Sequence, residues 1–320
     1  MKLKRLNANE PNFEKLYGMI EAMNELLEKG PKSILTLEEL LEFQDDDCSF
    51  KLFDSYRVPS DARVDFCYMP TYIGAAILMK EYLNGKRDLV TKLKRALMVS
   101  SKTNFYGHGY EMEKGRIEAV QIFIKGGLRK FLETDREICP EFHQKVNNIV
   151  HEYSSRLIRG YTRGLWNEDY SAQMREIVDN LKLDKRLYIA YGSNMDVSQM
   201  EIRCPGAEVV GKTYLKNWEL TLPHYANIER RVGKRTPVLI WETTKEDEIE
   251  LDRYEGYPVL YDKIDIIVNV NGKRMSAIAY VMTDEYKKLD KEPRSGYVEQ
   301  ILRGYRNAGF DESEFQPGKS

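Results

Sequence analysis

The stretch RLYIAYGSNM, residues 186–195, decides how the second half of this chain is interpreted. Residues 187–190, LYIA, form a short apolar run that is typical of a buried strand. The strand runs directly into the sequence GSN at residues 192–194. Such a turn leaves several backbone N–H groups without ladder partners, and these can converge on a carboxylate or phosphate oxygen. An ordinary turn between a strand and a loop would have the same sequence.

The composition is that of a globular protein with more than one domain. The chain has 320 residues, of which 31% are charged and 42% hydrophobic, and two domains are expected at this length. The 49 basic and 51 acidic side chains give a net charge of −2, so we expect neither a nucleic acid nor a membrane as partner. No apolar run approaches a transmembrane length, and the N-terminal sequence MKLKRLNANE lacks the apolar core of a signal peptide.

The four cysteines are scattered and form no CxxC pair. This pattern favours neither a zinc site nor a disulfide framework, so we expect a reducing, cytoplasmic setting.

From residue 10 to about 183 the apolar residues recur at helical spacing, as in the run Phe142, Val146, Ile149, Val150 and Tyr153. We therefore expect an all-α domain over residues 1–183. Its function stays open: a regulatory or partner-binding domain, a lid and a second enzyme all fit.

One loop in this half combines glycines, aromatic residues and a histidine: NFYGHGYE, residues 104–111. Loops of this content often carry function, and His108 can titrate near neutral pH. Equally, the aromatic residues can fill a core and the glycines permit tight turns. If the loop faces the turn at 191–194, His108 and Tyr110 become candidates for substrate selection.

Beyond residue 183 the pattern changes to strands. Residues 264–270 alternate between apolar and polar positions, Asn271-Gly272 follows, and residues 275–281 alternate back, which predicts a hairpin with a two-residue turn. Short strands are also expected at 208–211, 218–222 and 237–241. Two helices are expected at the edges, one over 245–254 capped by Thr244 and one that begins near Ser295.

The predicted fold class is therefore α+β and multidomain. An all-α domain precedes a mixed β-barrel domain with edge helices, which covers residues 184–320.

A carboxylate at the end of the first edge helix is a candidate general base. In LDRYEGYP, residues 251–258, Glu255 precedes a helix-ending glycine and lies between Tyr254 and Tyr257. Desolvation by aromatic neighbours would raise its pKa toward neutrality, where a general base works best. A solvated Glu in the last turn of a surface helix has the same local sequence.

Several of these motifs, in this order, resemble the gamma-glutamylcyclotransferase family, including its AIG2-like members, over about residues 185 to 315. The resemblance is carried by YGSN after a strand, Arg203-Cys204-Pro205, LDRYEG at 251–256, Tyr261, YVMT at 280–283, and the spacing of Pro293 and Tyr297. The sequence departs from the family at Arg294, where serine is frequent, and in the loop from His224 to Arg235.

The resemblance implies a transferase or lyase-type reaction in which a γ-glutamyl group cyclises to 5-oxoproline and releases an amine, amino acid or peptide. It implies that Glu255 is the catalytic acid and base and that no metal or cofactor takes part. The implied substrate-binding residues are Tyr191, Gly192, Ser193, Asn194, Tyr261 and Tyr297.

A second hypothesis is a non-catalytic module that uses the loop from Tyr191 to Asn194 to hold an acidic ligand or partner. A binding module has no need of a base at residue 255, so Glu255 favours the enzyme. The leaving group and the oligomeric state stay open.

Overall fold

The computed structural model of the chain describes residues 3–7, 12–53, 65–103, 112–288 and 293–318. The chain divides into two compact units, each described by itself below. The first comprises Met1–Phe142 and Gly160–Leu181, and the second comprises His143–Arg159 and Lys182–Ser320. The predicted domain boundary between residues 183 and 184 stays a prediction. The loop predicted to be functional at residues 104–111, with His108 and Tyr110, lies outside the described residues.

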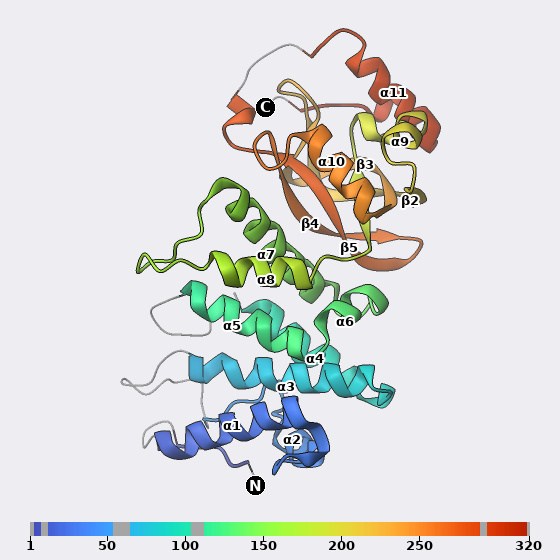
Figure 1. Cartoon of the computed structure of the whole chain (residues 1–320). Coiled ribbons are helices and arrows are strands. Elements are labelled where there is room, and N and C mark those ends of the chain that lie inside the picture. Colours follow the sequence, from blue (N-terminus) through green and yellow to red (C-terminus); the bar gives the residue numbers. More distant parts are fainter. Residues whose placement is uncertain (1–2, 8–11, 54–64, 104–111, 289–292, 319–320) are drawn as a thin grey trace. The chain divides into compact units, whose positions relative to one another are not determined.

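The described part of the first unit is built from helices (Figure 1). They are α1 (Phe13–Lys29), α2 (Leu37–Phe43), α3 (Asp65–Leu83), α4 (Val90–Lys102), α5 (Met112–Lys125), α6 (Leu128–Thr134) and α8 (Ser171–Asn180). Helix α3 contacts α1, α4, α5 and α6 and is buried along most of its length. Because it is covered by so many neighbours, its sequence is apolar without a polar face. None of the described helices is both long and apolar enough to cross a membrane.

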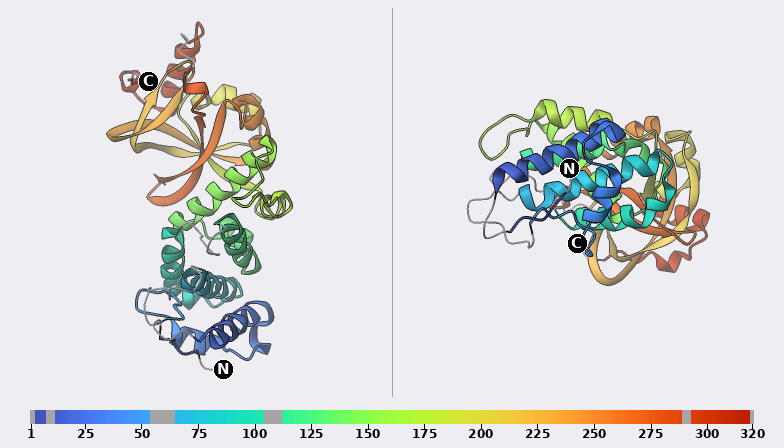
Figure 2. Two further views of the ribbon diagram at one scale, coloured as in Figure 1. Left: turned by 90° about the vertical axis from the view of Figure 1, so that its left-hand side faces the viewer. Right: turned by 90° about the horizontal axis from the view of Figure 1, so that it is seen from below.

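The described part of the second unit combines one five-stranded sheet with four α-helices (Figures 1 and 2). Its strands are β1 (Lys185–Ala190), β2 (Glu208–Thr221), β3 (Asn227–Thr244), β4 (Tyr261–Val270) and β5 (Lys273–Met282). Its helices are α9 (Val197–Arg203), α10 (Lys245–Glu255), α11 (Tyr297–Ala308) and the part from residue 143 onward of α7 (Pro140–Arg159).

The sheet has the order β2-β3-β1-β5-β4 and is mixed, because β1 pairs antiparallel with β3 but parallel with β5. The end of β1 therefore lies between the two long hairpins of the sheet. This central position explains why the turn that follows β1 can meet side chains from several elements.

Two local predictions are confirmed. Strands β4 and β5 form the predicted hairpin, with Asn271 and Gly272 in its turn at φ values of 52° and 79°. Thr244 caps α10: its Oγ1 accepts the N–H of Asp247 at 3.2 Å, and the Asp247 carboxylate accepts the N–H of Thr244 at 2.9 Å. The positive φ values and the reciprocal cap are what Asn-Gly and Thr-x-x-Asp favour locally.

The predicted mixed β-barrel is not confirmed, because the sheet is open. Within the described residues no backbone ladder joins the edge strands β2 and β4. Two side chains bridge them instead: Thr213 Oγ1 donates to the carbonyl of Asn269 at 2.7 Å, and Asn271 Nδ2 to that of Val210 at 3.0 Å. The register of β2 against β3 shifts twice, and such bulges bend a strand and interrupt its pairing.

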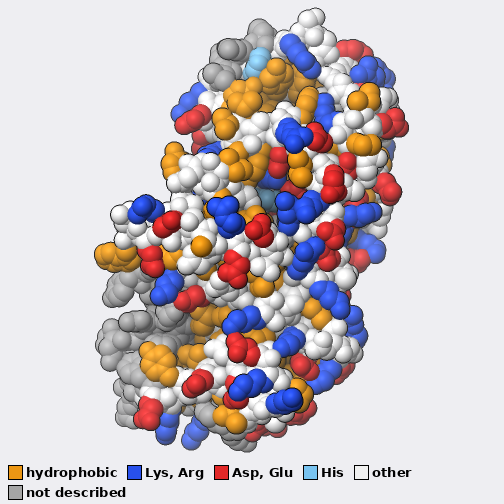
Figure 3. Space-filling model, viewed as in Figure 1, with side chains coloured by type: hydrophobic (Ala, Val, Ile, Leu, Met, Phe, Trp, Pro, Cys, Tyr) orange, Lys and Arg blue, Asp and Glu red, His pale blue; other side chains and the backbone are white. Residues whose placement is uncertain are grey.

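The strands predicted at 208–211, 218–222 and 237–241 are parts of two long strands, β2 and β3. Many of the intervening residues, such as Lys216 and Arg235, are polar and exposed, and they interrupt the hydrophobic pattern of each strand. On the face shown in Figure 3, acidic and basic side chains are interspersed.

Candidate active site

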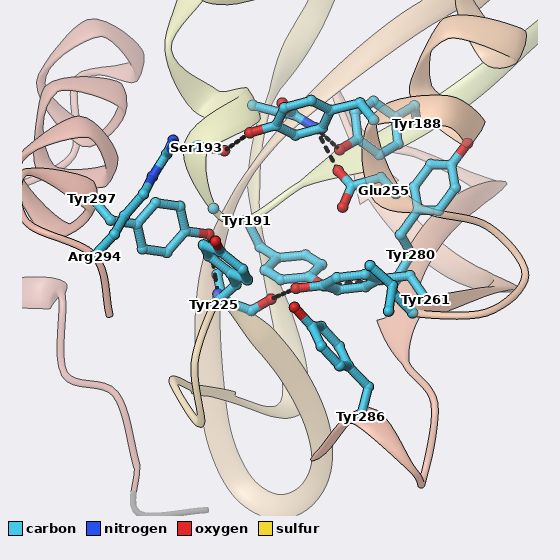
Figure 4. A pocket seen from close by; sticks show the side chains of 15 residues that line it. Tyr188, Tyr191, Ser193, Tyr225, Glu255, Tyr261, Tyr280, Tyr286, Arg294 and Tyr297 are labelled. Atoms are coloured by element: carbon cyan, nitrogen blue, oxygen red, sulfur yellow. Dashed lines mark hydrogen bonds between the residues drawn. The ribbon is translucent and has the colours of Figure 1, made fainter. Parts of the chain in front are cut away.

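A cavity of about 340 Å³ lies in the second unit where β1 ends. Eight of its fifteen lining residues are tyrosines. Figure 4 shows Glu255 and Tyr188 on one side of it and Arg294 with Tyr297 on the other. The cavity is therefore walled by aromatic rings and carries charged side chains from Glu255 and Arg294.

The structure brings all seven predicted site residues to this cavity. They come from the β1 turn, the end of α10, the start of β4 and the start of α11, and they are Tyr191, Gly192, Ser193, Asn194, Glu255, Tyr261 and Tyr297. Arg294, where the sequence departs from the family pattern, also lines it. Residues about 100 positions apart in the chain thus meet in one place.

The turn after β1 is a short 3-10 helix, Ser193–Met195. Its hydrogen bonds are donated by the N–H groups of Met195 and Asp196, to the carbonyls of Gly192 and Ser193 at 3.0 and 3.1 Å. In the described part of the chain no acceptor pairs with the N–H groups of residues 192–194. These amides are the donors that the sequence predicted for this turn.

Gly192 is required by close packing. A Cβ at this position would lie 2.8 Å from the Cβ of Ala226, closer than side chains approach each other. Any larger residue would push the β1 turn away from the loop between β2 and β3.

Two tyrosines hold that loop through Ala226. Tyr261 donates its hydroxyl hydrogen to the Ala226 carbonyl at 2.8 Å, whereas the Tyr297 hydroxyl accepts the Ala226 N–H at 3.1 Å. The hydrogen of Tyr261 is therefore used, and that of Tyr297 remains available to a neighbour or a ligand. Burial raises the pKa of both phenols, so both are neutral at pH 7.

Glu255 is the last residue of α10 and is only partly exposed. Its Oε1 accepts one hydrogen bond, from Asn194 Nδ2 at 2.9 Å. Burial raises the pKa of Glu255 to about 7, against the opposing effects of the Arg203 charge and the Asn194 bond, and the Asp252 charge raises it further. At neutral pH this carboxyl group can therefore both accept and return a proton.

The side-chain amide of Asn194 is held at both ends. Its Nδ2 donates to Tyr188 at 2.7 Å as well as to Glu255, and its Oδ1 accepts from the Arg203 guanidinium. Its backbone carbonyl accepts Trp241 Nε1 at 3.2 Å. The last residue of the YGSN motif is thus the direct contact of the candidate base.

Helix α10 is fixed to the sheet by one lysine that sequence reasoning missed. Lys263 Nζ lies 2.7 Å from Glu248 Oε1 and 2.9 Å from Asp252 Oδ1, both on α10. Tyr280 donates to Asp252 at 2.6 Å. Tyr261 and Lys263 lie on the same face of β4, because alternate residues of a strand point to the same side. The position of Lys263 two residues after the predicted site residue Tyr261 was therefore the signal in the sequence that could have found it.

A second group of interacting residues that sequence reasoning missed surrounds Asp265, which lies two residues beyond Lys263 on β4. Its carboxylate accepts from Asn147 Nδ2 at 3.1 Å, from His151 Nε2 at 2.8 Å and from Ser276 Oγ at 2.6 Å. Burial alone would raise the pKa of Asp265, but the bond from His151 and the nearby positive charge outweigh it, so the pKa lies below its usual value. Asp265 is therefore an anchor for α7 that is ionised at neutral pH.

Within the described residues no three His, Cys, Asp or Glu side chains converge as metal ligands do.

Comparison with known proteins confirms the resemblance for the C-terminal part of the chain. Residues 188–299 match the profile of the family described as gamma-glutamyl cyclotransferase, AIG2-like. A solved protein from Homo sapiens, described as uncharacterised, and a solved gamma-glutamyl cyclotransferase are each 22% identical, with a TM-score of 0.37 over 42% of this chain and 90% of theirs. An AIG2-like protein from Mus musculus is 17% identical, with a TM-score of 0.28 over 33% and 84%. No curated protein matches the chain.

Proposed function

We propose that the C-terminal unit, whose residues 188–299 match the gamma-glutamyl cyclotransferase, AIG2-like profile, cyclises a γ-glutamyl group to 5-oxoproline. The α-amine of the glutamyl group attacks its own γ-carbonyl carbon. A C–N bond to that amine forms, the original amide C–N bond breaks, and an amine, amino acid or peptide leaves. Water is neither consumed nor produced.

The observation that carries the proposal is the state of Glu255 in its cavity. An α-ammonium group must lose a proton before it can attack, and the departing nitrogen must gain one. A carboxyl group with a pKa of about 7 is present in both forms at neutral pH, so Glu255 can take the first proton and deliver it to the leaving nitrogen. Such proton transfer by a positioned side chain is worth about 10²- to 10⁴-fold in rate.

The β1 turn supplies donors for the negative charges of the substrate. The free N–H groups of residues 192–194 suit the glutamyl α-carboxylate. The Tyr297 hydroxyl, which accepts from Ala226 and retains its own hydrogen, suits the oxygen that becomes negative in the tetrahedral intermediate.

Because the reaction is intramolecular, much of the rate comes from holding the glutamyl chain folded. Pre-orientation of this kind accounts for about 7–11 kcal/mol of a barrier in favourable systems. A cavity of about 340 Å³ with aromatic walls suits this task, since it restricts the chain to compact conformations.

The test is release of 5-oxoproline from a panel of γ-glutamyl amines, amino acids and peptides, quantified by mass spectrometry. The wild-type chain is compared with Glu255→Gln, which keeps the shape of the side chain. The matched control is Glu250→Gln, the same change on a more exposed side chain of α10 that pairs with Arg253. We expect turnover of at least one substrate by the wild type and the control, and its loss in Glu255→Gln with substrate binding kept.

The panel also tests the second hypothesis, a non-catalytic binding module. Calorimetry on the same compounds that finds binding to the wild type without 5-oxoproline from any of them would contradict the enzyme and support the module. Equal turnover by wild type and Glu255→Gln would keep the activity but remove Glu255 from it.

A further inference from the structure

We propose that Arg203, at the end of α9, is a positioning residue for Glu255, which it controls through Asn194 and through its own charge. The inference rests on the proposed function and deepens it. It assigns a task to the arginine of the Arg-Cys-Pro sequence, which the resemblance singled out without giving it a role. Three features of the site carry it.

The first feature is the direction of the Asn194 amide. An amide side chain has one accepting and one donating end, and either can face a given neighbour. Arg203 has only donors, and it occupies the Oδ1 end of Asn194. The NH₂ end must therefore face the cavity, where its two hydrogens are used by Tyr188 and Glu255. Without Arg203 the amide can turn over and place an oxygen against the Glu255 carboxylate.

The second feature is how the guanidinium is held. The Cζ of Arg203 lies 3.2 Å from the centre of the Tyr254 ring, so the planar group stacks on the tyrosine. A guanidinium can combine such stacking with fixed N–H directions, which a lysine ammonium cannot reproduce. Tyr254 precedes Glu255 directly, so the stack ties α9 to the end of the helix that bears the candidate base.

The third feature is charge. Among the described residues no Asp or Glu forms a salt bridge with Arg203. Its positive charge is therefore not cancelled locally and acts on Glu255, where it favours the ionised form. Because burial acts in the opposite direction, Arg203 limits the rise of the Glu255 pKa.

Other groups also face the Glu255 side of the cavity, and they set the background against which Arg203 acts. They are Asp252 on α10, Tyr188 on β1, Tyr261 on β4 and Tyr280 on β5, and, from across the cavity, Arg294 just before α11 and Tyr297 at its start. Burial raises the pKa of the four tyrosines, so they stay neutral through the pH range of interest. Arg294 and Asp252 are unchanged in every variant compared below.

The experiment is a pH profile of kcat/KM for 5-oxoproline formation by the wild type, Arg203→Met and Arg203→Lys. In Arg203→Met we expect the midpoint of the acidic limb to move up by about one pH unit, because a nearby positive charge is lost. We also expect a fall of about tenfold at the pH optimum, because the amide is no longer fixed. Arg203→Lys restores the positive charge but not the stacking on Tyr254. We therefore expect its midpoint to lie close to the wild-type value, while its kcat/KM at the pH optimum stays below that of the wild type.

The control is Arg253→Met, which removes the same charge one residue before Tyr254. Arg253 is exposed and pairs with Glu250, away from the cavity. We expect its midpoint to equal that of the wild type. An unmoved midpoint in Arg203→Met, or an equal shift in Arg253→Met, would overturn the inference. A uniform loss at every pH that tracks a lower melting temperature would overturn it too, since a merely structural role predicts that result.

A second readout separates this inference from the proposed function. The titration of the Glu255 carboxyl carbon by ¹³C NMR, assigned with Glu255→Gln, needs no substrate. If no γ-glutamyl compound is turned over, the function fails, yet a raised Glu255 midpoint in Arg203→Met still supports Arg203 as the positioning residue. If turnover occurs and the midpoint does not move, the inference fails alone.

Discussion

Glu255 and Asp265 are two largely buried carboxylates in the same unit, and they have opposite properties. Glu255 is contacted by one side-chain donor and by aromatic rings, and its pKa is raised to about 7. Asp265 is contacted by three side-chain donors, and its pKa lies below the usual value. Burial raises the pKa in both cases, so the hydrogen bonds and positive charges around each carboxylate decide the outcome.

The difference separates a reactive group from a structural one. A carboxylate that is fully paired holds elements together, as Asp265 does for α7 and β4. A carboxylate that is buried with too few donors is costly to ionise, and that cost is what makes it a proton acceptor near pH 7. Such a group is a candidate for chemistry because the fold leaves it underpartnered.

The largest expected effect separates the two residues by activity. Glu255→Gln should lower kcat for 5-oxoproline formation by about 10²- to 10⁴-fold, because the proton transfer is lost. Its free energy of unfolding at pH 8 should not fall, since a neutral amide is easier to bury than a carboxylate. Steady-state kinetics and urea unfolding on the same preparation measure both. A variant that unfolds more easily and reacts normally would reverse the roles assigned here.

The next effect separates them by stability. Asp265→Ala leaves His151, Asn147 and Ser276 without their acceptor, and removing one member of such a buried network costs about 3–5 kcal/mol in the free energy of unfolding. Urea denaturation measures it. Asp262→Ala, on the same strand, is the control and should cost about 0.5 kcal/mol or less. Equal losses in the two variants would show that the donors around Asp265 contribute nothing special.

The pH dependence of stability should have opposite signs for the two groups. For Glu255 the pKa is higher in the folded than in the unfolded chain, so the folded state binds more protons between about pH 4.5 and 7 and stability falls as pH rises through that window. The loss is at most about 3 kcal/mol. For Asp265 the pKa is lowered, so its contribution is present above its unfolded pKa and is lost as pH falls through the folded value.

Urea unfolding of the wild type and Glu255→Gln at pH 5 and pH 8 isolates the contribution of Glu255 to the pH dependence of the free energy of unfolding. The variant should gain stability relative to the wild type at pH 8 and not at pH 5. A constant difference between the two proteins across this range would contradict a raised pKa.

The smallest effect concerns one donor. Ser276→Ala removes the 2.6 Å bond to Asp265 Oδ1 and leaves the bonds from Asn147 and His151 in place. We expect a loss of about 1.5 kcal/mol, the lower end for a hydrogen bond to a charged group. Chemical denaturation at pH 7 measures it. A loss as large as that of Asp265→Ala would mean that one hydroxyl, rather than the set of donors, holds the charge.

The sequence contained much of the candidate site. The order of YGSN, LDRYEG, Tyr261 and Tyr297 was sufficient to select seven residues that the structure brings to one cavity. The hairpin at Asn271-Gly272 and the cap at Thr244 were predictable because each depends on a few adjacent residues. These features are local, and local chemistry is visible in sequence.

The features that were missed depend on long-range partners. In α7 the apolar positions predicted the helix, but nothing in the local sequence gives a role to Asn147 and His151, which lie four residues apart. Their partner Asp265 lies more than 110 positions away, and no pattern in either segment points to the other. The open sheet was missed for the same reason, since edge pairing between β2 and β4 depends on the register shifts of β2.

The central claim is that Glu255, unlike Asp265, changes its charge near neutral pH. The most direct test is a pH titration of the side-chain carboxyl ¹³C resonances, assigned with Glu255→Gln and Asp265→Asn. We predict a midpoint near 7 for Glu255 and, for Asp265, a midpoint below the ordinary value for an aspartate. A Glu255 midpoint at about 4.5, the ordinary value for a solvated glutamate, would contradict the account.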